Sequence, residues 1–152
     1  MIEGARFVHV NLVARDWRRL AAFYEQVFGC EQVGPERDLS GAWLEDGTGL
    51  PGAAIRGVHL RLPGAGPDGP TVEIFQYEDL HEGTATAVNR PGWGHIGFAV
   101  QDVPEARREV LEAGGGEVGE TVTLEVPGVG QVTFAYLTDP EGNIVELQNW
   151  AH

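Results

Sequence analysis

Two histidines and two glutamates occupy matching places in the two halves of the sequence. His9 and Glu73 lie in the first half, and His95 and Glu146 lie in the second. Apolar residues flank each of them in stretches typical of β-strands, where successive side chains point to opposite faces. The apolar side chains suit contact with helices, so the four polar residues are expected on the opposite sheet faces. Imidazole nitrogens and carboxylate oxygens are donors that first-row divalent metals bind.

An internal repeat relates the two halves. Residues 9–16 resemble residues 95–102, because both read as a strand that begins with His and ends in Asp. Residues 67–74 resemble residues 140–147, because both read as a tight turn followed by a strand that carries Glu. The first copy has a longer middle, which the Gly/Pro-rich stretch 34–69 accommodates. The repeat predicts two modules with the same fold.

The repeat also predicts where the four polar residues meet. If the modules pack with pseudo-twofold symmetry, the two His–Glu pairs converge, and two buried carboxylates would repel each other and lose hydration. One divalent cation, either Ni, Co, Zn, Fe or Mn, removes both problems and leaves positions open for water or substrate. A single His or Glu on a strand is more simply a solvated or hydrogen-bonded residue. Their joint placement therefore carries the prediction of one metal held by His9, Glu73, His95 and Glu146.

The elements that must position these residues form an α+β pattern of strand, helix and about three strands in each half. A first helix is expected over residues 16–28, with Asp16 as the N-cap. A second helix is expected after Asp102, with Pro104 in its first turn. Further strands are expected at 54–62, 71–77, 132–137 and 144–150. We expect one domain over residues 1–152, built from modules at about 5–80 and 92–152 with a linker at 81–91.

Composition and charge limit the class of protein. The chain has 152 residues, of which 42% are hydrophobic, as in soluble globular proteins. No apolar run approaches the roughly 18 residues of a transmembrane helix, and no signal peptide is expected. The single cysteine, Cys30, suits a reducing cytoplasm. The net charge of −13 disfavours nucleic acid and anionic membranes as partners; it either attracts a cationic ligand or, more simply, keeps the protein soluble.

Three motifs together resemble a known superfamily. Residues 7–29 read FVHVNLVARDWRRLAAFYEQVFG, residues 93–103 read WGHIGFAVQDV, and residues 139–147 read DPEGNIVEL. They resemble the glyoxalase, bleomycin-resistance and extradiol dioxygenase proteins of the vicinal oxygen chelate superfamily. The resemblance covers nearly the whole chain and is weakest at residues 35–51. It implies two βαβββ modules forming a cupped mixed sheet around a metal that binds two adjacent substrate oxygens.

The ligand set is similar to that of glyoxalase I. Extradiol dioxygenases and fosfomycin-modifying enzymes usually have His at the position of Glu73. Glyoxalase I typically has Arg and Asn, which engage glutathione, at the positions of Val13 and Tyr77. We therefore expect glyoxalase-like metal chemistry with weak or no activity on the methylglyoxal–glutathione hemithioacetal.

The resemblance implies a metal-dependent lyase, isomerase or epimerase that acts on a small molecule with vicinal oxygens. Glu146 is the expected base, and Glu73 is the alternative. The expected substrate contacts are Asn11, Phe75, Tyr77 and Gln148. Two other functions stay open: a drug-binding resistance protein of the bleomycin-resistance type, and a dioxygenase of the same fold. A homodimer is expected, whether the modules close within one chain or swap between two. His59 and His81 are interpreted as surface residues.

Overall fold

The computed structural model describes residues 2–151 and divides into two compact units, Met1–Glu82 and Gly83–His152. Each unit contains one five-stranded sheet. The division falls inside the segment expected as a linker. No helix within residues 2–151 is long and apolar enough to span a membrane.

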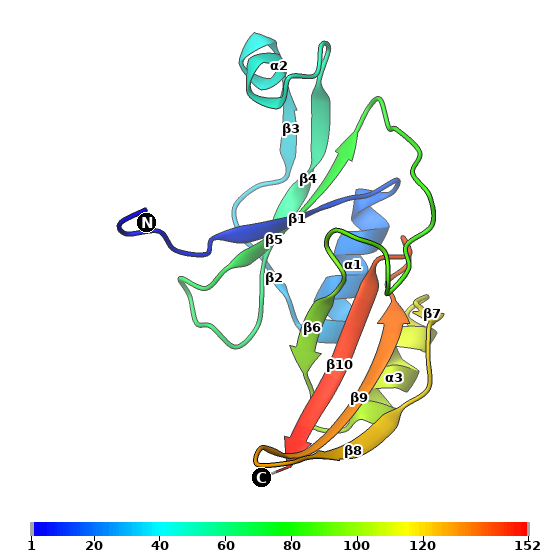
Figure 1. The fold of residues 1–152 in the computed structure, drawn as a ribbon. Helices are drawn as coiled ribbons and strands as arrows, with labels where there is room; N and C mark the ends of the chain where they lie inside the picture. Colours follow the sequence, from blue (N-terminus) through cyan, green and yellow to red (C-terminus); the bar gives the residue numbers. More distant parts are fainter. Residues whose placement is uncertain (1, 152) are drawn as a thin grey trace. The chain divides into compact units, whose positions relative to one another are not determined.

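The first unit is a mixed sheet with one long helix and one short helix (Figure 1). Its elements are β1 (His9–Val13), α1 (Trp17–Phe28), β2 (Glu31–Gln32), β3 (Arg37–Ser40), α2 (Ala42–Thr48), β4 (Ala54–Arg61) and β5 (Thr71–Tyr77). The strand order is β1-β5-β4-β2, and β3 also pairs with β4. Strand β1 runs parallel to β5, whereas the other pairs are antiparallel.

The second unit repeats this topology. Its elements are β6 (Ile96–Ala99), α3 (Val103–Glu112), β7 (Gly116–Glu117), β8 (Val122–Val126), β9 (Gly130–Thr138) and β10 (Ile144–Ala151). The order is β6-β10-β9-β7, and β8 also pairs with β9. Strand β6 runs parallel to β10, and β10 runs antiparallel to β9.

The expected pattern of strand, helix and three strands is confirmed in both units, with one strand interrupted in each. Strands β2 and β3 both pair with β4, and β7 and β8 both pair with β9. In the first unit the interruption contains Gly34, whose φ of 73° takes the chain out of extended geometry. The mixed α+β class is therefore the one expected from the sequence.

Several expected boundaries need correction. The strand expected at 54–62 ends at Arg61, and the one expected at 132–137 runs from Gly130 to Thr138. His95 immediately precedes β6, so it is not itself a strand residue. Helix α2 was not expected. It interrupts the hairpin between β3 and β4, and Leu44 buries it against the sheet.

Both long helices begin as predicted. The Asp16 side chain accepts a hydrogen bond from the Arg19 backbone N–H at 3.1 Å, and the Asp102 side chain accepts one from Glu105 at 2.9 Å. Such N-caps satisfy a backbone donor that the helix itself leaves unpaired. Helix α1 ends at Gly29, whose φ of 65° is favourable for glycine.

The helices cover one face of each sheet and leave the other for polar residues. Helix α1 contacts β4 and β5, and α3 contacts β9 and β10. Strand β1 alternates exposed His9, Asn11 and Val13 with half-buried Val10 and Leu12. The period of two along each strand thus separates the core side chains from the candidate site. The core side chains of the first unit include Leu20, Tyr24, Val58, Leu60, Val72 and Ile74.

Candidate metal centre

In the first unit, Glu73 lies between two strands that bring polar side chains to its carboxylate. In the parallel pairing of β1 with β5, Asn11 is directly opposite Glu73. The Asn11 Nδ2 donates a hydrogen bond of 3.4 Å to Oε2 of Glu73, and Nε2 of His9 lies 3.6 Å from that oxygen. Asn11, which is an expected substrate contact, thus lies next to a predicted metal ligand.

On the other side of Glu73, strand β4 contributes a residue that the sequence interpretation missed. His59 is directly opposite Glu73 in the antiparallel pairing of β4 with β5. Its Nε2 lies 3.5 Å from Oε1 of Glu73, and its ring centroid lies 5.5 Å from that of Phe75. The interpretation of His59 as a surface residue is wrong, because only 24% of its side chain is exposed.

The surroundings of His59 favour the neutral imidazole. Burial lowers its pKa, and the charges of Arg37 and His9 act in the same direction. The carboxylate of Glu73 acts against them and raises the pKa, but the net shift is downward. A neutral imidazole still carries one N–H that can donate to a carboxylate.

The second unit brings together the other predicted pair. Nε2 of His95 lies 2.9 Å from Oε2 of Glu146. Gly97 is opposite Glu146 in the pairing of β6 with β10, and Tyr136 is opposite it in the pairing of β9 with β10. The centroid of the Tyr136 ring lies 5.2 Å from that of the His95 ring. Burial raises the pKa of the Tyr136 phenol, and the negative charge of Glu146 raises it further.

The two half-sites share their register but differ in the neighbours of the carboxylate. In each unit the residue two positions after the histidine is opposite the glutamate: Asn11 in the first and Gly97 in the second. A Cβ atom built on Gly97 would lie 3.7 Å from Oε2 of Glu146, so there is room where Asn11 has its amide. The residue opposite Glu73 on β1 is thus a side-chain donor, whereas the residue opposite Glu146 on β6 has no side chain.

The donor set fits a divalent transition metal. The first unit places two imidazole nitrogens, those of His9 and His59, within 4.0 Å of the Glu73 carboxylate, and the second unit places that of His95 within 4.0 Å of Glu146. Nitrogen and oxygen donors of this kind suit divalent transition metals. Between residues 2 and 151, no group of three or more His, Cys, Asp and Glu residues is spaced to hold a metal ion.

The remaining expected substrate contacts have partners of their own. Phe75 and Tyr77 pack against a small cluster formed by Leu44, Ala53 and Ile55. Oε1 of Gln148 accepts a hydrogen bond of 2.9 Å from Nε1 of Trp150. His81 is exposed, as expected.

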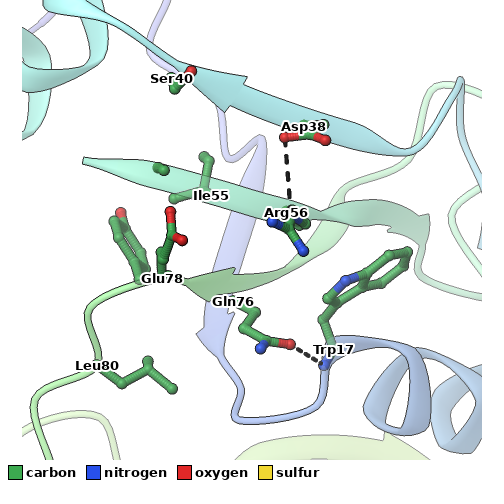
Figure 2. A pocket seen from close by; sticks show the side chains of 10 residues that line it. Trp17, Asp38, Ser40, Ile55, Arg56, Gln76, Glu78 and Leu80 are labelled. Carbon is green, nitrogen blue, oxygen red and sulfur yellow. Dashed lines mark hydrogen bonds and ion pairs between the residues drawn. The ribbon is translucent and has the colours of Figure 1, made fainter. Parts of the chain in front are cut away.

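A pocket of about 430 Å³ lies near the start of α1, next to the ends of β4 and β5. Figure 2 shows Arg56 beside Asp38 and the Gln76 side chain reaching the Trp17 backbone N–H. Arg56 Nε lies 4.0 Å from Asp38 Oδ1. Tyr77 lines this pocket, but the residues around the Glu73 carboxylate do not. The pocket therefore does not contain the candidate metal ligands of the first unit.

Comparison with solved structures gives whole-chain matches at low sequence identity. A glyoxalase family protein from Bacillus cereus matches with a TM-score of 0.83 and 19% identity, covering 100% of this chain and 99% of that chain. A fosfomycin resistance protein, FosX, from Listeria monocytogenes, complexed with Mn(II) and sulfate, matches with a TM-score of 0.55 and 15% identity, covering 99% and 95%. A V278E mutant of glyoxalase I from Zea mays matches with a TM-score of 0.63 and 20% identity, covering 93% and 45%.

Comparison with protein families gives the assignment. No curated protein matched the sequence. The family model described as Glyoxalase/Bleomycin resistance protein/Dioxygenase superfamily matches residues 6–147, which is nearly the whole chain. The fold resemblance inferred from the three sequence motifs is thus confirmed. The chain belongs to the glyoxalase/bleomycin resistance protein/dioxygenase superfamily.

Proposed function

We propose that this protein is a metal-dependent lyase, isomerase or epimerase that acts on a small molecule with two vicinal oxygens. The observation that carries the proposal is the pair of matched half-sites, in which His9 lies close to Glu73 and His95 lies close to Glu146. Superfamily membership supports it. The FosX relative in complex with Mn(II) gives a precedent for a divalent metal in this fold.

In this proposal the ligands of one divalent ion are His9, Glu73, His95 and Glu146. A bound divalent ion would act as a Lewis acid toward two neighbouring oxygens of the substrate and would stabilise negative charge that develops on them. The protein's own residues position the substrate and transfer the proton.

Glu146 is the proposed base. A carboxylate bound to a dication is a poor base, because the cation lowers its proton affinity. One carboxylate must therefore be free to turn toward the substrate. Glu73 accepts a hydrogen bond from Asn11, whereas the corresponding neighbour of Glu146 is Gly97, which has no side chain to hold it. Glu146 would take the proton from the carbon next to the chelated oxygens and return it to the same or the neighbouring carbon.

The polar face of each sheet suggests what surrounds the substrate. Phe75 and Tyr77 supply an apolar wall in the first unit, and Gln148 supplies a polar group in the second. Asn11 is better explained as a support for Glu73 than as a substrate contact. Because Val13 and Tyr77 lack the groups that engage glutathione in glyoxalase I, the proposed substrate is a hydroxycarbonyl or dicarbonyl compound without a glutathione moiety.

The proposal is tested by exchange of substrate protons with solvent. Metal-loaded protein is incubated in D₂O with a panel of α-hydroxycarbonyl compounds, and loss of the α-proton signal is followed by NMR. We expect Glu146→Gln to keep metal, because its amide oxygen can still bind the ion, and to lose exchange, because an amide is not a base. Exchange at the wild-type rate in Glu146→Gln, together with its loss in Glu73→Gln, would reverse the two roles. Tight binding of a cationic drug without metal or turnover would favour the drug-binding alternative.

A further inference from the structure

Both oxygens of the Glu73 carboxylate have side-chain neighbours, and they come from both adjacent strands. Oε2 has Asn11 Nδ2 at 3.4 Å and His9 Nε2 at 3.6 Å. Oε1 has His59 Nε2 at 3.5 Å. Only 14% of the Glu73 side chain is exposed, so water has limited access to compete for these oxygens.

We propose that His59 is a positioning residue that orients the Glu73 carboxylate for metal binding. In the tautomer with its proton on Nε2, the imidazole donates to Oε1 and leaves a lone pair of Oε2 for the metal next to His9. The distance of 3.5 Å is longer than a typical N–H···O hydrogen bond of about 2.9 Å, so the proposed role requires the Glu73 carboxylate to turn slightly toward His59. This inference rests on the proposed function, because it requires Glu73 to be a metal ligand.

The His59 ring is held in place by its surroundings. It lies against the ring of Phe75, with 58° between the two planes. Phe75 in turn packs against the cluster that contains Leu44 and Ile55. The neighbours of His59 along β4, Val58 and Leu60, are buried on the opposite face of the sheet. A donor held in this way loses little conformational freedom when it binds a carboxylate.

The sheet itself does not require an imidazole at this position. Tyr136 occupies the corresponding place in the second unit, directly opposite Glu146. Strands β4 and β9 therefore carry different side chains, His59 and Tyr136, at the position opposite the glutamate. Since a phenol ring packs at the corresponding place opposite Glu146, packing alone does not require the imidazole opposite Glu73.

Two substitutions separate hydrogen bonding from packing. His59→Phe keeps an aromatic ring against Phe75 and removes the N–H donor. His59→Gln removes the ring but keeps an amide donor of suitable reach. His81→Ala is the matched control, because it removes an exposed histidine away from Glu73. For each protein, Co(II) affinity is measured by titration, the visible spectrum of the Co(II) protein is recorded, and the melting temperature is measured without metal.

We expect His59→Phe to weaken Co(II) binding by about 10- to 100-fold and to alter the Co(II) spectrum, as loss of a hydrogen bond to a ligand does. The Co(II) affinity of His59→Gln should stay within a few-fold of the wild-type value, and that of His81→Ala should equal the wild-type value. Wild-type affinity and spectrum in His59→Phe would overturn the proposed role, as would a His59→Gln variant that melts normally but binds as weakly as His59→Phe. Absence of Co(II) binding by the wild-type protein would overturn the proposed function as well.

Discussion

Asp139 holds the turn that leads into β10, and its removal should destabilise the second unit. One of its carboxylate oxygens, Oδ1, accepts hydrogen bonds from the backbone N–H groups of Glu141 at 2.9 Å and Asn143 at 3.0 Å. The other, Oδ2, accepts one from Asn143 Nδ2 at 2.8 Å. Asp139 is only 2% exposed, so water cannot readily replace it. The turn fixes the start of the strand that carries Glu146.

The expected size of the effect follows from these contacts. A hydrogen bond to a charged group contributes about 1.5–3 kcal/mol, and a buried donor left unpaired costs a similar amount. Bonds that share one carboxylate are not additive, so Asp139→Ala should lower the free energy of unfolding by about 2–4 kcal/mol. Chemical denaturation followed by circular dichroism measures this change.

The first unit supplies a matched control. Gly69 N–H donates to Gly66 O at 3.0 Å, just as Gly142 N–H donates to Asp139 O at 3.0 Å, so the two turns share a backbone hydrogen bond. Asp68 lies in the first of these turns and is exposed. Asp68→Ala should change stability by less than about 0.5 kcal/mol. An equally small effect of Asp139→Ala would refute the reasoning.

Three further predictions concern reactivity and catalysis. Burial raises the pKa of the Cys30 thiol to about 11, so native protein at pH 8 should react with thiol reagents only after unfolding; rapid labelling of native protein would contradict this. Gly97→Asn places an amide donor next to Glu146 and should slow α-proton exchange by about tenfold without loss of metal. An unchanged rate would show that holding this carboxylate does not matter. Turnover of the methylglyoxal–glutathione hemithioacetal should be weak or absent because Val13 and Tyr77 cannot engage glutathione; robust turnover would refute this.

The sequence predicted the polar faces well because strand geometry is regular. A period of two fixes the face of every residue in a strand once one is known. His9 and Glu73 were assigned to one face of the first sheet from their apolar neighbours, and they lie 3.6 Å apart. Helix α1 was predictable for similar reasons, since its cap at Asp16 and its end at Gly29 are local signals.

The position of His59 next to Glu73 could not be predicted from the sequence, because it depends on how two strands pair. Local sequence patterns carry no information on that pairing. The position of His59 opposite Glu73 is set by the register of β4 against β5. Helix α2 was missed because seven residues that include Gly47 give a weak helical signal, and its stability comes from the packing of Leu44 on the sheet. In both cases the deciding interaction is tertiary.

Metal content of the purified protein tests the central claim most directly. After incubation with a divalent transition metal and removal of excess ion, elemental analysis should find about one ion for each set of His9, Glu73, His95 and Glu146, and a chelator should remove it. His9→Ala and Glu146→Ala should each lose most of this metal, because each removes one of four ligands, whereas the exposed His81→Ala control should keep it. Wild-type protein that retains no metal, or variants that both retain the wild-type amount, would contradict the account.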